Sequence, residues 1–521
     1  MQEMPAVDLL VVGGGINGAG IARDAAGRGL RVCLVEQADL ASFTSSASTK
    51  LIHGGLRYLE YREFRLVREA LAERERLLAI APHLIRPLRF VLPHASGLRP
   101  RWQIRLGLLV YDHVGGRKRL PASAPIDLAS DASGAPLKPR FARGFAYSDC
   151  SVDDSRLVVA NALDAAARGA AILTRTRLSR ASAASGGWQA ECLDLATGRA
   201  IEVRARAIVN ATGAWVNAVR RSAGLRAPEQ VRLIQGSHIV VPRLFEGPQA
   251  YILQNPDRRV VFVIPFEERF TLIGTTDVPY GGSLERVRAS AEEIAYLCES
   301  VNRYFKRAIE PSQVVWSYSG VRALRDDQAS EAAAITRDYE LDLEHAAGAA
   351  PLLSVIGGKI TTFRRLAEAA LAKLQPLIGG SSRRWTDGAP LPGGDLPNAD
   401  LQKFSTDATR RWPSLPAYLL ARLARAYGTR MELILGRASS LGELGESFGA
   451  DLTCAEVDYL IAHEWARSAD DILWRRSKLG LLLPKEGAAR LDHRLRAGGL
   501  GESLERTAAC DVARGQSEKR D

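Results

Sequence analysis

The N-terminal stretch of the chain decides the fold: residues 8–20 read DLLVVGGGINGAG, and residues 31–36 read RVCLVE. An apolar run, a glycine-rich turn, a helical segment and a second apolar run predict a strand–helix–strand unit. Gly13 permits the tight turn, Gly15 lets the backbone approach a diphosphate, and Gly18 lets the helix lie close to the strand. The unit is therefore expected to bind a dinucleotide, whose diphosphate meets the free N–H groups at the helix N-terminus.

An acidic residue closes the second apolar run. Glu36 stands where a carboxylate can accept a hydrogen bond from a ribose hydroxyl. The glycine pattern and this acid do not distinguish FAD from a nicotinamide dinucleotide, because both ligands carry a diphosphate and ribose.

Length and charge limit the possible classes of protein. With 521 residues, two or three domains are expected rather than one core. The 70 Lys and Arg residues exceed the 59 Asp and Glu residues, giving a formal net charge of +11. The sequence has no zinc-ligand spacing, RNP-like strand or basic tail, so nucleic-acid binding has only charge in its favour. An anionic membrane surface, an anionic substrate or a solvated surface explains the charge equally well.

Cysteine usage and the N-terminus indicate a cytoplasmic protein. The six cysteines are scattered and form no CxxC pair, which is typical of reduced thiols. The sequence has no signal-peptide pattern and no apolar run of membrane-spanning length. His463-Glu464 does not extend to HExxH, because Arg467 stands at the second histidine position, and we expect no metal.

Later segments predict that the chain returns to the nucleotide-binding sheet. Residues 207–215 and 352–356 are typical of strands that rejoin it, while strand-rich segments at 170–210 and 231–280 interrupt it. Helices are expected over 60–78, 155–168 and 361–374, a loop over 121–136, a linker over 389–395, and helices again to about 497. The sequence thus predicts a discontinuous α/β sheet with a separate strand-rich substrate layer.

Several short motifs together identify a family. They are TSSASTKLIHGGLRYLE at 44–60, SHIVVP at 237–242, IGTTD at 273–277, SYSGVR at 317–322, AITRDY at 334–339, GGKITT at 357–362, HEW at 463–465 and DDILWRR at 470–476. The chain resembles the FAD-dependent glycerol-3-phosphate dehydrogenases, most of all the bacterial quinone-linked enzymes. The resemblance is dense over 8–375 and persists to about 483.

The resemblance implies an FAD-binding, Rossmann-like domain of the amino-acid-oxidase type with an inserted antiparallel β-rich substrate domain and a C-terminal α-helical domain. The FAD-dependent oxidoreductase region is expected at 1–388, with FAD binding at about 1–90, 140–230 and 350–388 and substrate binding at about 91–139 and 231–349. The helical domain is expected at 389–504 and a disordered polar tail at 505–521. The chain departs from the family pattern at Ala323, where proline is expected; this affects loop stiffness rather than chemistry.

The resemblance also implies the reaction. The family oxidises sn-glycerol 3-phosphate to dihydroxyacetone phosphate, with hydride transfer from C2 to N5 of FAD, and passes electrons to ubiquinone. A related flavin oxidoreductase acting on an amino acid or a 2-hydroxy acid is the alternative. Such a substrate has one carboxylate and needs one arginine, whereas three candidate arginines favour a dianion. A basic nucleic-acid-binding protein that retained the fold is the non-enzyme alternative, and it would be colourless when purified.

The resemblance makes FAD the ligand of the glycine turn and implies further contacts. The short donors at 45–50 suit phosphate and ribitol hydroxyls, although alone they read as a solvated loop. The turn at 357–359 precedes a helix whose N-terminus, with Lys359, can stabilise an anionic reduced flavin; an ordinary turn capped by Thr361 is the alternative. Thr212 and Gly213 either meet the adenine side or merely end a strand. The expected cofactor-binding residues are Gly13, Gly15, Asn17, Gly18, Glu36, Ser45, Ser46, Thr49, Lys50, Thr212, Gly213, Gly357, Gly358, Lys359 and Thr361.

Substrate contacts are expected from the family motifs. A phosphate monoester carries close to two negative charges at neutral pH, and guanidinium groups match its oxygens bidentately. Arg57, Arg322 and Arg337 are the expected phosphate ligands. Tyr58 and Thr276 are expected to hydrogen-bond the substrate hydroxyls.

Oxidation of a secondary alcohol also requires a base for the hydroxyl proton. His238 and His53 are candidates by residue type, although a histidine in a strand is commonly structural. We favour His238 as the catalytic base, with Arg322 and Lys359 stabilising the developing alkoxide.

One segment suits a membrane surface. Residues 99–111 read RPRWQIRLGLLVY, with cations again at 117–119. A short apolar helix with Trp, Tyr and flanking cations suits insertion into one leaflet, whereas a core helix is the alternative. A quinone acceptor favours a peripheral or monotopic protein on the inner face of the cytoplasmic membrane, in contact with anionic lipids. A homodimer is the candidate assembly.

Overall fold

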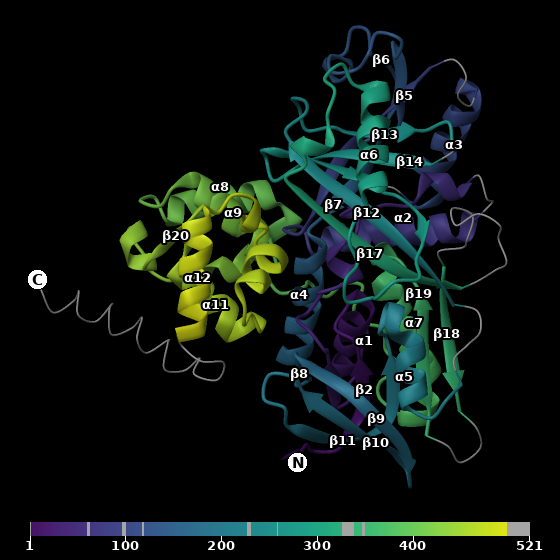
Figure 1. The fold of residues 1–521 in the computed structure, drawn as a ribbon, viewed down its shortest axis with the longest axis vertical. Helices are drawn as coiled ribbons and strands as arrows, with labels where there is room; N and C mark the ends of the chain where they lie inside the picture. Colours follow the sequence, from purple (N-terminus) through teal and green to yellow (C-terminus); the bar gives the residue numbers. More distant parts are fainter. Residues whose placement is uncertain are drawn as a thin grey trace, which may run out of the picture.

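The computed structural model describes residues 2–59, 63–95, 100–116, 119–226, 231–257, 259–325, 338–345 and 350–497. Two sheets lie one above the other in Figure 1, and a helical C-terminal domain packs beside α4. The helices of the sheet-bearing part are α1 (Ile16–Gly27), α2 (Phe64–Ile80), α3 (Arg101–Val114), α4 (Asp154–Ala167), α5 (Val216–Ser222), α6 (Ala291–Tyr304) and α7 (Phe363–Ile378). Within the part of the chain so described, no helix combines the length and apolarity needed to cross a membrane.

The nucleotide sheet is built on parallel strands that end at one edge. Its order is β18 (Tyr339–Glu344), β19 (Leu352–Gly357), β11 (Ala200–Asn210), β2 (Val7–Val12), β3 (Val32–Val35) and β8 (Ala171–Leu173); β1 (Gln2–Glu3), β9 (Thr176–Ala184) and β10 (Gly187–Asp194) join through β11. In the parallel ladders, Val12 lies opposite both Val35 and Asn210. Because the carboxyl ends of parallel strands meet at one edge, the turns after β2, β3, β11 and β19 converge there.

Two layers cover this sheet. Helices α1, α4 and α7 share a buried core with Leu9 and Val11 on one face. On the other face, β9, β10 and α5 share a second core with Leu10 and Val203. The strands β2, β3 and β19 are mainly apolar because both faces of the sheet are covered there, as is usual for parallel sheets.

The second sheet is largely antiparallel. Its order is β16 (Val278–Pro279), β12 (Val231–Pro242), β15 (Phe270–Gly274), β14 (Val260–Phe266), β13 (Ala250–Gln254), β5 (Ile85–His94), β7 (Arg143–Val152) and β4 (Leu51–Ile52); β17 (Trp316–Arg325) pairs with β12 and β6 (Ala124–Asp127) with β7. Helix α6 packs on one face, and α2 and α3 pack on the other. The antiparallel register of β12 and β17 places Gly236 opposite Gly320 and Ile234 opposite Arg322, which brings the 317–322 motif to the side facing the nucleotide sheet.

The C-terminal domain has its own core. It contains α8 (Leu401–Arg411), α9 (Ala417–Tyr427), α10 (Met431–Leu435), α11 (Cys454–Glu464), α12 (Lys485–Ala497), the hairpin β20 (Ser447–Gly449)–β21 (Leu452–Thr453), and a π-helical turn at Asp471–Arg476. The hairpin and the π-helical turn interrupt the helical pattern expected from the sequence. The connection to this domain packs against the nucleotide-binding part. Trp385 Nε1 donates to the Asp24 carbonyl at 3.2 Å, and the Trp385 ring contacts the guanidinium groups of Arg23 and Arg168.

Three local expectations differ from the structure. The loop expected over 121–136 contains the edge strand β6, in which Pro125 costs nothing because an edge strand needs few donors. Strand β18 belongs to the nucleotide sheet, whereas the boundaries place it in the substrate domain. Strand β5 lies largely within the region expected to bind FAD but belongs to the second sheet. The domain boundaries themselves stay a prediction.

Candidate functional site

A cleft of about 470 Å³ lies where the carboxyl edge of the nucleotide sheet meets β17 of the second sheet. Its walls come from the turn after β2, the segment 41–49, the start of β9, the end of β11, β17 and the segment 357–361. Segments that are hundreds of residues apart in the sequence therefore contribute to one site.

The glycine turn has no room for side chains. Gly13 has φ +111°, and a Cβ atom there would lie 2.6 Å from the Ala211 carbonyl oxygen. A Cβ atom on Gly18 would lie 1.9 Å from the Gly13 carbonyl oxygen, so Gly18 supports the turn from behind. Gly15 lines the cleft, where a Cβ atom would approach Ser45 Oγ to 3.0 Å. The turn leaves backbone without side chains at the N-terminus of α1, as the binding of a diphosphate requires.

Gly14 is a further requirement that the sequence analysis did not single out. Its N–H donates to Glu36 Oε2 at 2.7 Å, and an added Cβ atom would lie 2.8 Å from the Glu36 Cβ. The three consecutive glycines were a visible signal, but the usual fingerprint leaves the middle position unspecified.

Glu36 lines the cleft and is nearly fully buried. Its other oxygen accepts from the Ala38 N–H at 2.8 Å. Burial raises the pKa of this carboxyl, while the two backbone N–H groups act in the opposite direction. Each oxygen retains a second lone pair, so Glu36 holds its own loop and still has capacity for a ribose hydroxyl.

The segment 44–50 divides into residues that face the cleft and residues that do not. Ser45 and Thr49 line it, and Ser45 Oγ accepts from the Ile16 N–H at 2.9 Å. Ser46 and Lys50 are not among the lining residues. The Ser46 hydroxyl donates to the Phe43 carbonyl at 3.2 Å.

Lys50 in particular turns away from the expected cofactor position. Its buried Nζ lies 2.8 and 2.9 Å from the two carboxylate oxygens of Asp154 and also donates to the Ser46 carbonyl. Desolvation lowers the pKa of Lys50, and Asp154 acts against that effect. The side chain of Lys50 thus forms an ion pair at the start of α4, and its expected contact with FAD stays a prediction.

The segment 357–361 completes the opposite end of the cleft. Asn17 Nδ2 donates to the Gly357 carbonyl at 3.3 Å, which joins α1 to the turn after β19. Asn17 Oδ1 is buried and has no hydrogen-bond partner among the described residues. Lys359 Nζ lies 3.6 Å from the centre of the Tyr58 ring, and both residues line the cleft.

Thr361 is buried and fixes the neighbouring backbone. Its hydroxyl accepts from the His53 N–H at 3.2 Å and lies 3.3 Å from the His53 carbonyl. A short 3₁₀ turn, Ile360–Thr362, precedes α7, so the helix begins two residues later than expected. Thr361 lines the cleft but does not cap α7.

The remaining expected FAD contacts are placed as follows. Thr212 and Gly213 line the cleft, and the Thr212 hydroxyl donates to Asn210 Oδ1 at 2.7 Å. The cleft is also lined by Thr44, Ser48, Arg177 and Trp215, which the sequence analysis did not select. Thr44 and Ser48 lie within a family motif and could have been found there, whereas nothing in the sequence pattern signals Arg177.

Arg322, on β17 of the second sheet, lines the cleft. Its NH1 lies 2.8 Å from Asp277 Oδ1. A Cβ atom on Gly236 would lie 2.7 Å from the Arg322 guanidinium, so a glycine on the neighbouring strand makes room for it. The side chain of Arg57 and the whole of Arg337 lie outside the described residues.

Thr276 forms hydrogen bonds inside the second sheet, and its expected contact with a substrate hydroxyl stays a prediction. Its hydroxyl donates to Glu293 and accepts from the Ser237 N–H at 2.9 Å. The side chain is buried and is not part of the cleft wall. Glu293 also accepts from Ser237 and Gln235, so Thr276 belongs to a buried network that ties α6 to β12.

His238 is also set back from the cleft. It is fully buried, its ring stacks on Tyr318, and its Nε2 lies 2.9 Å from Thr49 Oγ1. Desolvation, reinforced by Arg322 and Lys50, lowers the pKa of His238 well below its usual value, so the ring is neutral at pH 7. His238 is not part of the cleft wall, and its role as the catalytic base stays a prediction. Thr49 lies between His238 and the cleft, whereas His53 lines the cleft itself.

Comparisons with known proteins agree with this geometry. The family described as "FAD dependent oxidoreductase" matches residues 8–364, and "C-terminal domain of alpha-glycerophosphate oxidase" matches residues 384–496. The chain belongs to the FAD-dependent oxidoreductases. The glycerol-3-phosphate dehydrogenase of Pseudomonas aeruginosa is 53% identical over 94% of this chain and 95% of its own length. The D-erythritol 1-phosphate dehydrogenase of Brucella abortus is 51% identical over 92% and 95%, respectively.

A solved structure supports the fold of this FAD-dependent oxidoreductase. The glycerol-3-phosphate dehydrogenase of Bacillus halodurans, complexed with FAD, superposes with a TM-score of 0.73 at 24% identity and covers 96% of this chain and 94% of that one. The predicted fold class, the family and the cofactor FAD are thereby confirmed. The residues fit the cofactor: Gly13 and Gly15 leave bare backbone, and the buried Asn17 Oδ1 is available to a ligand.

Proposed function

We propose that the protein oxidises sn-glycerol 3-phosphate at C2 to dihydroxyacetone phosphate. The observation that carries the proposal is the position of Arg322, on a wall of the cleft that also contains the glycine turn. A cation at this place suits a phosphate monoester, and the glycerol-3-phosphate dehydrogenase relative matches nearly the whole chain.

The cofactor-binding assignments form part of this proposal. Gly13, Gly15, Asn17, Ser45 and Thr49 would hold the diphosphate and ribitol, and Glu36, Thr212 and Gly213 the adenosine end, while Gly357, Gly358, Lys359 and Thr361 would lie beside the flavin ring. FAD supplies the acceptor for the hydride released from the substrate carbon. Side chains of the protein would bind and orient the substrate and remove its hydroxyl proton.

Arg322 would bind the phosphate, and Asp277 would orient its guanidinium. Lys359 and Tyr58, which already contact each other, would meet the hydroxyl side of the substrate. A cation near the reacting hydroxyl stabilises the negative charge that develops when its proton leaves.

The proton acceptor is proposed to work through Thr49. Because its Nε2 contacts Thr49 Oγ1, His238 could accept a proton that passes through this hydroxyl. His53 is the alternative acceptor, since it lines the cleft.

D-Erythritol 1-phosphate is a second candidate substrate, since the Brucella abortus relative named for it is nearly as similar to this chain. Both compounds are phosphate monoesters of polyols with an oxidisable secondary alcohol. They differ in the length of the carbon chain beyond the reacting centre.

The substrate can be tested by anaerobic bleaching of the bound flavin near 450 nm. Glycerol 3-phosphate is expected to bleach the flavin within seconds, while D-alanine and lactate leave it yellow. Faster bleaching by D-erythritol 1-phosphate would assign the second candidate, and bleaching by D-alanine or lactate alone would overturn the proposal.

Ubiquinone is the proposed electron acceptor, reached from the inner face of the cytoplasmic membrane. Helix α3 supports this because it buries one side and exposes large apolar side chains on the other. Trp102 is 70% exposed and Leu106 is 54% exposed, with Leu109 nearby in the helix and Arg101 at its start. Exposed apolar side chains beside cations are typical of a helix that lies in one leaflet.

Replacing both Trp102 and Leu109 with glutamate is expected to reduce flotation with anionic liposomes at least fivefold, because two apolar anchors become charged. Tyr418→Glu, which changes an exposed aromatic residue in the C-terminal domain, is the matched control and should float like the unmodified protein. Equal flotation of all three proteins would contradict the assignment of α3. Reoxidation of the reduced protein by a ubiquinone analogue, compared with air, tests the acceptor. A homodimer stays a prediction.

A further inference from the structure

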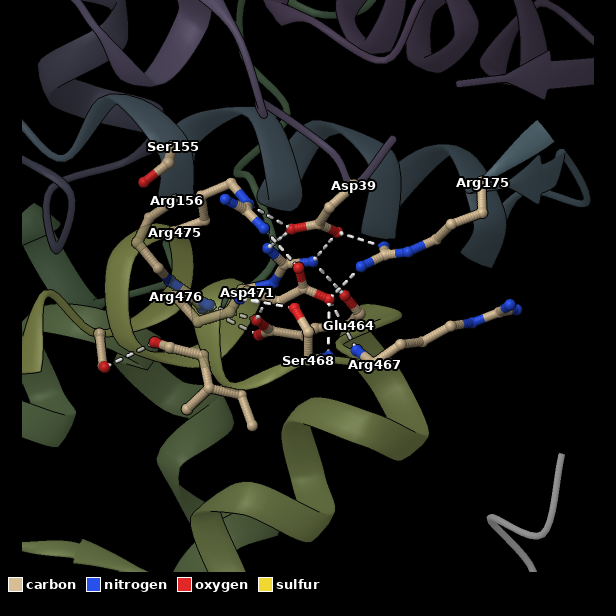
Figure 2. A network of polar contacts seen from close by, with 12 residues as sticks. Asp39, Ser155, Arg156, Arg175, Glu464, Arg467, Ser468, Asp471, Arg475 and Arg476 are labelled. Atoms are coloured by element: carbon tan, nitrogen blue, oxygen red, sulfur yellow. Dashed lines mark hydrogen bonds and ion pairs between the residues drawn. The ribbon is translucent and has the colours of Figure 1, made fainter. Parts of the chain in front are cut away.

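A buried ion-pair network joins the C-terminal domain to the cofactor-binding loop (Figure 2). Asp39 follows Glu36 by three residues and is almost completely buried. Its carboxylate accepts from Arg475 Nε at 2.7 Å and from both terminal nitrogens of Arg476 at 2.8 Å. Both arginines belong to the π-helical turn Asp471–Arg476, an irregular element that is frequent at functional sites.

The same turn also reaches the start of β9. Asp471 is fully buried and pairs with Arg475 and with Arg175. It also accepts from the Arg467 and Ser468 N–H groups at 2.7 and 3.1 Å. Arg175 is followed directly by Thr176 and Arg177, which line the cleft.

Backbone hydrogen bonds connect the residues of this ion-pair network to the cleft wall. The Arg175 N–H donates to the Ala38 carbonyl at 2.9 Å, and the Thr176 N–H donates to the Glu36 carbonyl at 2.7 Å. The Ala38 N–H in turn donates to the Glu36 carboxylate. Asp39 and Arg175, the two points held by the C-terminal domain, therefore bracket the segment that presents Glu36.

The network is a poor explanation of stability alone. Taking several charges out of water costs more than most ion pairs return, and apolar replacements of buried ion pairs are often neutral or stabilising. Burial acts to raise the pKa of Asp39, but Arg476 and Arg475 lower it to about 2, so the carboxylate is charged across the physiological range. A charged Asp39 held by Arg475 and Arg476 therefore fixes the position of the loop that contains Asp39.

We propose that Arg475 and Arg476 of the C-terminal domain are positioning residues for FAD, because they hold Asp39 and thereby fix the loop that carries Glu36. The C-terminal domain then sets the affinity for the cofactor without touching it. This inference depends on the cofactor site and is independent of which polyol phosphate is oxidised.

The test compares two arginines of similar environment. The side chain of Arg475 is 17% exposed and pairs with Asp39; that of Arg422 is 15% exposed and pairs with Glu456 inside the C-terminal domain. Each is replaced by glutamine in the full-length protein. FAD affinity is measured by titrating the apoprotein and following the quenching of FAD fluorescence, and the thermal midpoint is measured with and without FAD.

Arg475→Gln is expected to weaken FAD binding about tenfold or more, while the midpoint of its apoprotein falls no further than that of Arg422→Gln. Arg422→Gln should bind FAD within twofold of the unmodified protein. Asp39→Asn should weaken FAD binding at least as much as Arg475→Gln, because it weakens the pairs of Asp39 with both Arg475 and Arg476. Adding Arg475→Gln to Asp39→Asn should then cost less than Arg475→Gln does alone, because the pair between the two residues is already weakened.

Unchanged FAD affinity in Arg475→Gln, or an equal loss in Arg422→Gln, would overturn the proposal and leave the network a purely structural role. If Arg475→Gln does not fold, Arg475→Lys keeps the charge but loses the planar guanidinium. Arg475→Lys is expected to weaken FAD binding by a smaller factor than Arg475→Gln. If Arg475→Lys and Asp39→Asn, measured separately, both bind FAD with wild-type affinity, the proposal is equally refuted.

Discussion

Replacing Arg322 with methionine is expected to lower kcat/KM for glycerol 3-phosphate about a hundredfold to a thousandfold, or about 3–4 kcal/mol. Methionine keeps much of the length of the side chain but removes the charge and the paired donors that a phosphate dianion accepts. The loss should appear largely in KM, because the phosphate is remote from the carbon that is oxidised. Steady-state kinetics with a dye acceptor measures both constants.

Two further variants test whether the loss is due to the guanidinium group of Arg322. Arg325→Met lies on the same strand, but the Arg325 side chain is 54% exposed and pairs with Glu340, so this variant should retain normal kinetics. Arg322→Lys keeps the charge without the planar pair of donors, and its kcat/KM should lie between those of Arg322→Met and Arg325→Met. Normal affinity of Arg322→Met for glycerol 3-phosphate would remove Arg322 from the substrate site.

Replacing Gly13 with alanine is expected to abolish FAD binding, with an affinity loss of about a thousandfold or more and a colourless purified protein. The added methyl group meets the Ala211 carbonyl oxygen at 2.6 Å, and φ of +111° is unfavourable for any side chain. The turn must open to relieve both effects, which moves the backbone away from the diphosphate. Absorbance near 450 nm and FAD titration measure the result.

Gly29→Ala is the matched control for this backbone effect. Gly29 has φ +82° at the end of α1, but an added Cβ atom there meets nothing within 4 Å. It should cost about 1 kcal/mol of stability and keep full FAD content. A yellow Gly13→Ala protein with normal affinity would contradict the role of the turn.

The nucleotide-binding unit could be predicted because its requirements are local. The turn, the helix and Glu36 lie within 29 residues, and each follows from steric limits of a short backbone segment. The same holds for β11, which ends at Asn210 within the expected segment 207–215, and for β19, because their buried apolar ends match a sheet covered on both faces.

The direction of individual side chains could not be predicted in the same way. Lys50 turns toward Asp154, and Thr276 turns toward Glu293 on α6, because those carboxylates are buried and need donors. Nothing near Lys50 or Thr276 in the sequence reveals these partners. His238 was selected by residue type, yet its burial behind Thr49 depends on the pairing of β12 with β15 and β17.

The discontinuous nucleotide sheet also dictates when a newly made chain can take up its flavin. Strand β2 is synthesised early, but its neighbour β11 ends only at Asn210, and the neighbour of β11, β19, ends at Gly357. At about 5–20 residues per second, translation leaves the first glycine turn without its final neighbours for tens of seconds. Flavin loading is therefore expected late in biogenesis, after the ribosome has delivered most of the polypeptide.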